Sequence, residues 1–71
     1  MSTGPIEIQL NGASHRLPGG CSVAQLLVDA GLGERRVAVE VNGAIVPRSG
    51  HGERIVHDGD RVEIVHALGG G

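Results

Sequence analysis

Two Asn-Gly pairs limit the fold of this chain more than any other feature of its sequence. Asn11-Gly12 follows a segment in which apolar and polar residues alternate, and Asn42-Gly43 follows a segment with β-branched residues on one parity. Asn and Gly both tolerate positive φ, which the tight turn of a two-residue hairpin requires. Each pair therefore predicts an antiparallel β-hairpin. The strands of the two hairpins are expected over residues 6–10, 13–17, 37–41 and 44–46.

Between the two hairpins lies the one segment with helical periodicity. Ser22 can accept hydrogen bonds from first-turn N–H groups, and Gln25 three residues later completes a capping box. An apolar stripe at i, i+3, i+4 and i+7 follows, made of Val23, Leu26, Leu27 and Ala30. Gly31 is suited to end the helix in the left-handed conformation, and Leu32 is expected to pack beside the helix end.

The C-terminal third predicts one more long strand. A turn at Asp58-Gly59-Asp60 leads into residues 61–67, with Val62 and Ile64 on the inner face. Upstream of it we expect a loop over residues 49–52 and a very short strand at residues 55–56. Because the first and last strands are not hairpin neighbours, they are free to pair in parallel at the centre of the sheet. The fold class is therefore α+β, one sheet packed on one helix.

Composition excludes several classes of function. The chain of 71 residues allows one small domain, which leaves little room for the walls of a catalytic pocket. A net charge of −2 and the lack of Phe, Tyr and Trp argue against nucleic-acid binding. Its single cysteine fits a reducing cytoplasm, and no apolar run is long enough for a membrane span. We expect a cytoplasmic carrier, binding module or subunit.

The C-terminus carries the strongest functional signal. Leu68 is followed by Gly69, Gly70 and Gly71, which cost backbone entropy and add nothing to a core. A segment without Cβ atoms is thin enough to thread a narrow channel, and residues 68–71 extend at most roughly 13–14 Å. We therefore expect a domain over residues 1–67 and a flexible glycine tail over residues 68–71. The alternative is a frayed terminus with no task.

Three stretches of the sequence resemble the ThiS family of sulfur carriers. They are VAVEVNGAIVPR at residues 37–48, DGDRVEIV at residues 58–65 leading into ALGGG at residues 67–71, and the helix opening SVAQLL at residues 22–27. The resemblance covers nearly the whole chain except its first residues. It implies a ubiquitin-like β-grasp fold, with a mixed sheet of four to five strands packed on one helix.

The same resemblance implies a chemistry for the C-terminus. The Gly71 carboxylate is adenylated by a ThiF-like activating enzyme, which uses ATP and Mg²⁺, and then becomes a thiocarboxylate with sulfur from a donor protein. Thiazole synthase receives this sulfur in thiamin biosynthesis. Leu68, Gly69 and Gly70 form the approach into the partner's channel. The chain itself binds no cofactor and acts as a protein co-substrate rather than as an enzyme.

Other readings of the tail stay open. The small subunit of molybdopterin synthase resembles ThiS in fold and tail, and sulfur carriers of other pathways share the same chemistry. A β-grasp binding module with an idle tail belongs to a different class, as does a modifier that is conjugated to lysines of other proteins. The chain contains no lysine of its own, so it cannot accept such a conjugate on a side chain.

Three further sets of residues have a structural and a functional interpretation. Ile45, Val46 and Arg48 either organise a sheet edge or form a docking surface for a partner. The four histidines, His15, His51, His57 and His66, lack ligand spacing and are expected to be surface residues without a metal. Cys21 precedes the helix, whose dipole can lower a thiol pKa for a persulfide relay, or it is a small packed residue.

Overall fold

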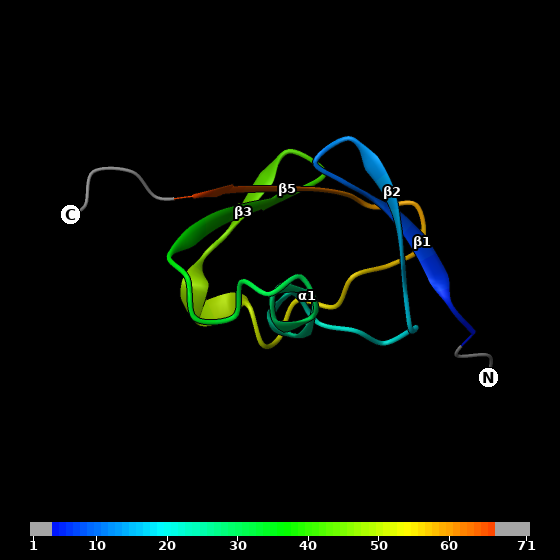
Figure 1. Cartoon of the computed structure of the whole chain (residues 1–71), viewed down its shortest axis with the longest axis horizontal. Helices are drawn as coiled ribbons and strands as arrows, with labels where there is room; N and C mark the ends of the chain where they lie inside the picture. Colours follow the sequence, from blue (N-terminus) through cyan, green and yellow to red (C-terminus); the bar gives the residue numbers. More distant parts are fainter. Residues whose placement is uncertain (1–3, 67–71) are drawn as a thin grey trace.

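The computed structural model describes residues 4–66 of the chain. Figure 1 shows two layers, a twisted sheet and a single helix that lies across one of its faces. The elements in chain order are β1 (Ile6–Leu10), β2 (Ala13–Leu17), α1 (Val23–Asp29), β3 (Val37–Val41), β4 (Ala44–Val46), the 3₁₀-helix η1 (Arg48–Gly50) and β5 (Arg61–His66). The α+β class expected from the sequence is confirmed.

The sheet is mixed and has the strand order β2-β1-β5-β3-β4. Both predicted hairpins form as antiparallel pairs, β1 with β2 and β3 with β4. Strand β5 runs parallel to β1 and antiparallel to β3, so the last strand of the chain lies at the centre of the sheet. The parallel pairing of first and last strands, left open by the sequence, is therefore present.

The two hairpin asparagines do more than turn the chain. Asn11 and Asn42 have φ of 52° and 53°, as a turn with two left-handed residues requires. Their side chains also reach β5 from either side: the Arg61 N–H donates to Asn42 Oδ1 at 2.9 Å, and the Ile64 N–H donates to Asn11 Oδ1 at 2.8 Å. Each asparagine thus fixes the central strand as well as its own turn.

Helix α1 begins at the predicted N-cap, but the Gln25 side chain makes no bond back to the Ser22 N–H, so the predicted capping box is only half formed. Ser22 has extended backbone dihedrals and its Oγ accepts from the Gln25 N–H at 3.1 Å, which satisfies one of the free donors of the first turn. At the other end Gly31 has a φ of 79°, the left-handed conformation that stops the helix. Val23, Leu26 and Leu27 are buried against the sheet. Ala30, expected in the apolar stripe, is the C-cap and is exposed.

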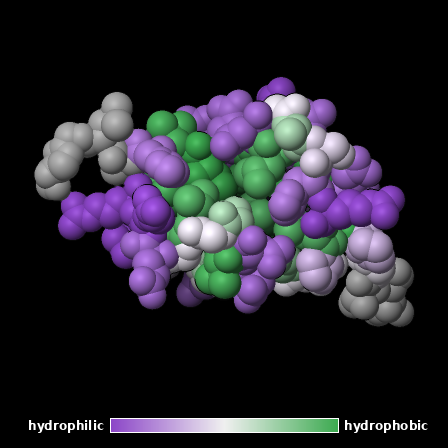
Figure 2. Space-filling view, viewed as in Figure 1, coloured by the Kyte–Doolittle hydropathy of each residue, from purple (hydrophilic) through white to green (hydrophobic). Residues whose placement is uncertain are grey.

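The core between the two layers is aliphatic apart from one cysteine. Leu32 is partly buried and packs against this core at the helix end, as the sequence predicted. Figure 2 shows hydrophobic residues in the middle of the face seen in Figure 1, with hydrophilic residues around them. The buried apolar residues are Ile8, Leu17, Cys21, Val23, Leu26, Leu27, Val39, Val41, Val46, Val56, Val62 and Ile64.

Two local expectations need correction. The segment after Pro47 begins with the 3₁₀-helix η1, closed by the Gly50 N–H donating to the Pro47 carbonyl at 2.8 Å, where a plain loop was predicted. The short strand expected at residues 55–56 is a single bridge between Ile55 and Ser22. Both segments are too short for periodicity to distinguish a strand or helical turn from a loop.

Acid should weaken the turn that leads into β5. Burial alone raises the pKa of Asp60, but bonds from the His57 N–H and the Asn42 side chain, with Arg54 and His57 nearby, bring the pKa below its usual value. The stabilisation is present above the unfolded-state pKa of about 3.9 and is lost as pH falls through the lower folded-state value.

We therefore expect the free energy of unfolding to fall as pH drops below about 4, and to fall less in Asp60→Asn than in the wild type. Urea titrations followed by far-ultraviolet circular dichroism at several pH values would measure this difference. Asp29→Asn, which removes an exposed carboxylate on α1, is the matched control. An Asp60→Asn curve parallel to the wild-type curve would contradict the assignment.

Candidate functional site

The residue expected to carry the chemistry lies just beyond the part of the chain that the structure describes. Gly71, with Leu68, Gly69 and Gly70, falls outside residues 4–66. Strand β5 ends at His66, and residues 67–71 follow it directly. What the structure defines is therefore the base from which this segment departs.

That base is firmly held. Val62 and Ile64 anchor β5 in the core, with 0% and 8% of their surface exposed. Strand β3 pairs with β5 along its whole length, from Val41 opposite Val62 to Val37 opposite His66. Strand β1 pairs with the start of β5, at Arg61 and Val62, so the end of β5 that leads to residues 67–71 is held by β3. A segment attached here starts from a defined position and direction.

The outer face of the sheet, opposite the helix, has an unusual composition near this end. Val65 and Ile45 are 61% and 69% exposed. Val65 lies directly opposite Ala38, and the next outward-facing pair along the same two strands is Glu63 opposite Glu40. Glu40 is in turn opposite Ile45 of β4. Apolar and acidic side chains thus share one outward-facing surface on β3, β4 and β5, on which Glu40 is half-buried and the others are exposed.

The three residues considered for partner docking do not all belong to an exposed surface. Ile45 is exposed on β4 and Arg48 is exposed in η1. Val46 is only 8% exposed and belongs to the core, because successive side chains of a strand point to opposite faces. The side chain of Val46 is therefore not available to a partner, and the docking proposal is restricted to Ile45 and Arg48.

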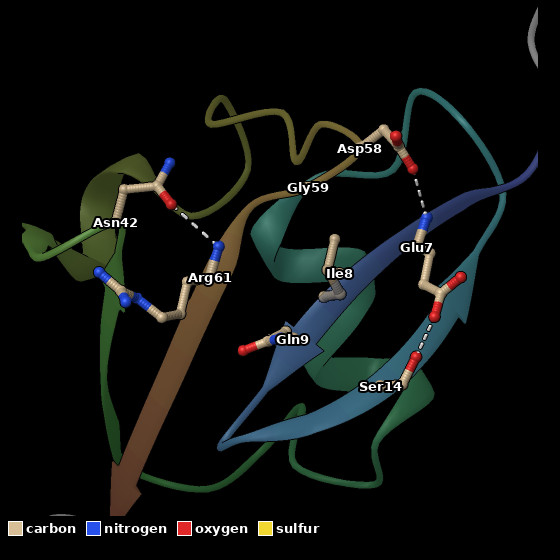
Figure 3. A pocket seen from close by; sticks show the side chains of 8 residues that line it. All are labelled: Glu7, Ile8, Gln9, Ser14, Asn42, Asp58, Gly59 and Arg61. Carbon is tan, nitrogen blue, oxygen red and sulfur yellow. Dashed lines mark hydrogen bonds between the residues drawn. The ribbon is translucent and has the colours of Figure 1, made fainter.

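A shallow hollow of about 510 Å³ lies at the other end of the outer face, beside the start of β5. Figure 3 shows three hydrogen bonds in this hollow. The Glu7 N–H donates to the Asp58 carboxylate at 2.8 Å, and the Ser14 hydroxyl donates to the Glu7 carboxylate. The third bond runs from the Arg61 N–H to the Asn42 side-chain oxygen. The lining residues are Glu7, Ile8, Gln9, Ser14, Asn42, Asp58, Gly59 and Arg61.

The hydrogen bonds in this hollow join β1 to β2 and to the turn before β5, and they join the β3–β4 turn to the start of β5. The Gly59 N–H also donates to the Glu7 carbonyl at 2.8 Å, and the Gln9 N–H to the Asp60 carbonyl at 3.0 Å. These polar groups are engaged with one another, and the contact of the Ser14 hydroxyl with the Glu7 carboxylate is an exposed cross-strand hydrogen bond between β2 and β1. We assign the hollow a structural task, that of closing the sheet around β5.

All four histidines were expected at the surface, and for His51 this prediction is wrong. His51 is 8% exposed, and its Nε2 lies 3.1 Å from the Val46 carbonyl oxygen, so it ties η1 to β4. The Nε2 of His15 is buried without a hydrogen-bond partner. Among residues 4–66 no three His, Cys, Asp or Glu side chains come together as metal ligands would. Within residues 4–66 no helix has both the length and the apolar character that a membrane span requires.

Cys21 is buried, in agreement with the structural interpretation of this residue. Burial, with the nearby Asp29 carboxylate, raises the pKa of the Cys21 thiol, where the position before the helix had suggested a lowered pKa.

Because its pKa is raised, less of the Cys21 thiol is ionised at neutral pH than of an ordinary cysteine, and we expect slow alkylation by iodoacetamide. Mass spectrometry in native buffer and in urea would measure it; equal rates in both would contradict this account.

Comparison with known proteins identifies the family. The ThiS family model matches residues 8–71, which is most of the chain. The chain belongs to the ThiS family. A crystal structure of the thiamine biosynthesis protein ThiS from Geobacter metallireducens superimposes with a TM-score of 0.80, at 30% identity, over 93% of this chain and all of the other. The ubiquitin-like β-grasp fold implied by the resemblance is confirmed by this match.

Relatives of known sequence add a second observation. This chain is 38% identical over 66 residues to a thiazole synthase of Magnetococcus marinus, and 39% identical over 66 residues to one of Paramagnetospirillum magneticum. Each match covers 93% of this chain but only 20% of the relative, so the ThiS-like segment is about a fifth of those longer proteins. An uncharacterized protein of Porphyra purpurea is 32% identical, with 93% of both chains covered.

Proposed function

We propose that this ThiS-family chain is a sulfur carrier of thiamin biosynthesis and that the Gly71 carboxylate is its reacting group. The carboxylate attacks the α-phosphate of ATP on a ThiF-like activating enzyme, releasing pyrophosphate and forming an acyl adenylate. Sulfur at the oxidation level of sulfide, supplied by a donor protein, then displaces AMP and leaves a thiocarboxylate. Thiazole synthase transfers the sulfur atom to its substrate, and an oxygen atom from water or from the substrate carbonyl restores the carboxylate.

The observation that carries this proposal is the family match extending to Gly71 itself, the last residue of the sequence. The fold supports it physically. The strand that leads to Gly71 is the central strand of the sheet, paired with β3 from Val62 to His66 and with β1 at its start, so the domain holds one end of residues 67–71 while a partner takes the other. A carboxylate needs a partner to supply its leaving group, which fits a co-substrate rather than an enzyme.

The thiazole pathway is favoured over molybdopterin synthesis by the relatives. Two proteins named thiazole synthase contain a segment at least 38% identical to this chain. When a carrier-like segment and a synthase are parts of one chain, each is present at a high effective concentration near the other. This arrangement is an advantage only if the two act on each other. Thiazole synthase is therefore the partner we assign to the thiocarboxylate.

A reconstitution with two acceptors tests the pathway. The chain, first converted to its thiocarboxylate, is offered to thiazole synthase with its small-molecule substrates, and separately to the large subunit of molybdopterin synthase with its precursor. The expected result is thiazole product in the first reaction and no dithiolene product in the second. The reverse outcome assigns the chain to molybdopterin synthesis, and activity with neither acceptor rejects both pathways.

A further inference from the structure

The surface formed by Ala38, Glu40, Ile45, Glu63 and Val65, here called the outer patch, has a feature that costs stability. Glu40 and Glu63 are directly opposite each other on neighbouring strands, so their Cβ atoms are about 4.5–5.5 Å apart. Like charges in such a pair destabilise a sheet. Neither carboxylate has a hydrogen bond or ion pair within the part of the chain that the structure describes. The nearest cation on this face by register is Arg61, diagonal to Glu40.

The apolar members of the outer patch are also unusually exposed. Val65 and Ile45 keep 61% and 69% of their surface in contact with solvent, on either side of the acidic pair. In the isolated chain this surface leaves aliphatic side chains in water and two carboxylates without a cationic partner. Its complement is a protein surface with an apolar contact area and a basic side chain.

The position of the outer patch indicates that its partner is an enzyme that acts on Gly71. Five residues separate His66 from the end of the sequence, and fully extended they span at most about 17–18 Å. An enzyme that acts on Gly71 must therefore place its active site within that distance of the end of β5. Val65 is adjacent to His66, so such an enzyme comes close to the outer patch if it approaches the sheet from the face opposite α1.

We propose that the outer patch is the docking surface for thiazole synthase, and that the synthase inserts an Arg or Lys side chain between Glu40 and Glu63. This inference rests on the proposed function, and the choice of partner rests on the two longer thiazole synthases that contain a ThiS-like segment. The repulsion between the two carboxylates in the free chain is relieved in the complex, so the pair favours binding at the expense of stability.

This arrangement predicts opposite effects of one substitution on two measurements. Glu63→Gln removes the like-charge contact, so the melting temperature of the free chain rises by about 1–4 °C. The same variant binds thiazole synthase about tenfold more weakly, because the inserted cation loses a carboxylate partner. A substitution that merely damaged the fold would lower both stability and affinity.

The experiment is isothermal titration of the full chain into thiazole synthase from the same genome, at about 50 mM and about 300 mM salt. The wild type is expected to bind more weakly at high salt, and the double variant Glu40→Gln/Glu63→Gln to lose most of this salt dependence. Asp29→Asn removes an exposed carboxylate from α1, on the other layer, and serves as the control with unchanged affinity.

The outcomes separate this inference from the proposed function. If the wild type binds but both Glu variants bind equally well, the acidic docking surface is wrong and the carrier function is unaffected. If the wild type does not bind thiazole synthase, both this inference and the assigned partner are wrong. Formation of the thiocarboxylate on Gly71 is measured without the synthase, so that part of the proposed function is judged separately.

Discussion

Deletion of Gly71 is expected to reduce thiocarboxylate formation by at least about 100-fold while the fold stays intact. The deletion withdraws the reacting carboxylate by about 3.3–3.6 Å, and a misplacement of about 1 Å is enough to cost about 100-fold in rate. Within residues 4–66 the buried apolar residues lie between Ile8 and Ile64, so we expect the free energy of unfolding to change by less than about 0.5 kcal/mol.

The measurement is intact mass after incubation with the activating enzyme, ATP and a sulfur source, together with a urea denaturation curve for each protein. Gly71→Ala is the companion variant, because it keeps the length and the carboxylate and adds only a methyl group to the segment that enters the partner. A marked loss of stability on deletion would show that Gly71 belongs to the folded core. Full activity after deletion would show that another group carries the sulfur.

Replacement of Leu26 by alanine should largely unfold the protein. Leu26 is fully buried, in the middle of the only face of α1 that meets the sheet. Removing a buried leucine side chain costs about 2–5 kcal/mol, through lost burial and the cavity left behind. A domain of this size has a net stability of only roughly 3–5 kcal/mol, so the loss consumes most of it.

Far-ultraviolet circular dichroism in urea is the suitable measurement, since the chain contains no aromatic residue for fluorescence. Gln25→Ala is the matched control: Gln25 is exposed on the same helix, and its side chain can be removed for less than about 0.5 kcal/mol. If Leu26→Ala unfolded at the same urea concentration as the wild type, the packing of α1 against the sheet would not stabilise the fold as described above.

The sequence predicted the fold well because its local signals agree with one another. Ser22 and Gly31 are strong start and stop signals for a helix, and Asn11 and Asn42 stand at turns that accept positive φ. The strand alternation placed Val62 and Ile64 inside correctly. Each of these signals acts within a few residues, which is the range over which a single sequence is informative.

Features that depend on the register between distant strands could not be predicted. Alternation places Glu40 and Glu63 on the outer face, but nothing local shows that they are directly opposite. The contact of Asn11 with the Ile64 N–H spans 53 positions of the chain and depends on the parallel pairing of β1 with β5. The burial of His51 depends in the same way on where η1 packs against β4.

The functional prediction had a different basis. The reacting residue, Gly71, was identified from its place after two other glycines and from family resemblance, and the described structure stops at His66. The partner surface was predicted at Ile45, Val46 and Arg48, of which Val46 is a core residue. A strand of three residues is too short for alternation to reveal which of its side chains points inward.

The most direct test of the central claim is the mass of the intact chain after incubation with a ThiF-like activating enzyme, ATP, Mg²⁺ and a sulfur donor. The account predicts a gain equal to the difference between one sulfur and one oxygen atom, with fragmentation placing it on Gly71 and no gain when ATP is omitted. An unchanged mass, with an enzyme that converts another ThiS protein in parallel, would contradict the assignment of this chain as a sulfur carrier.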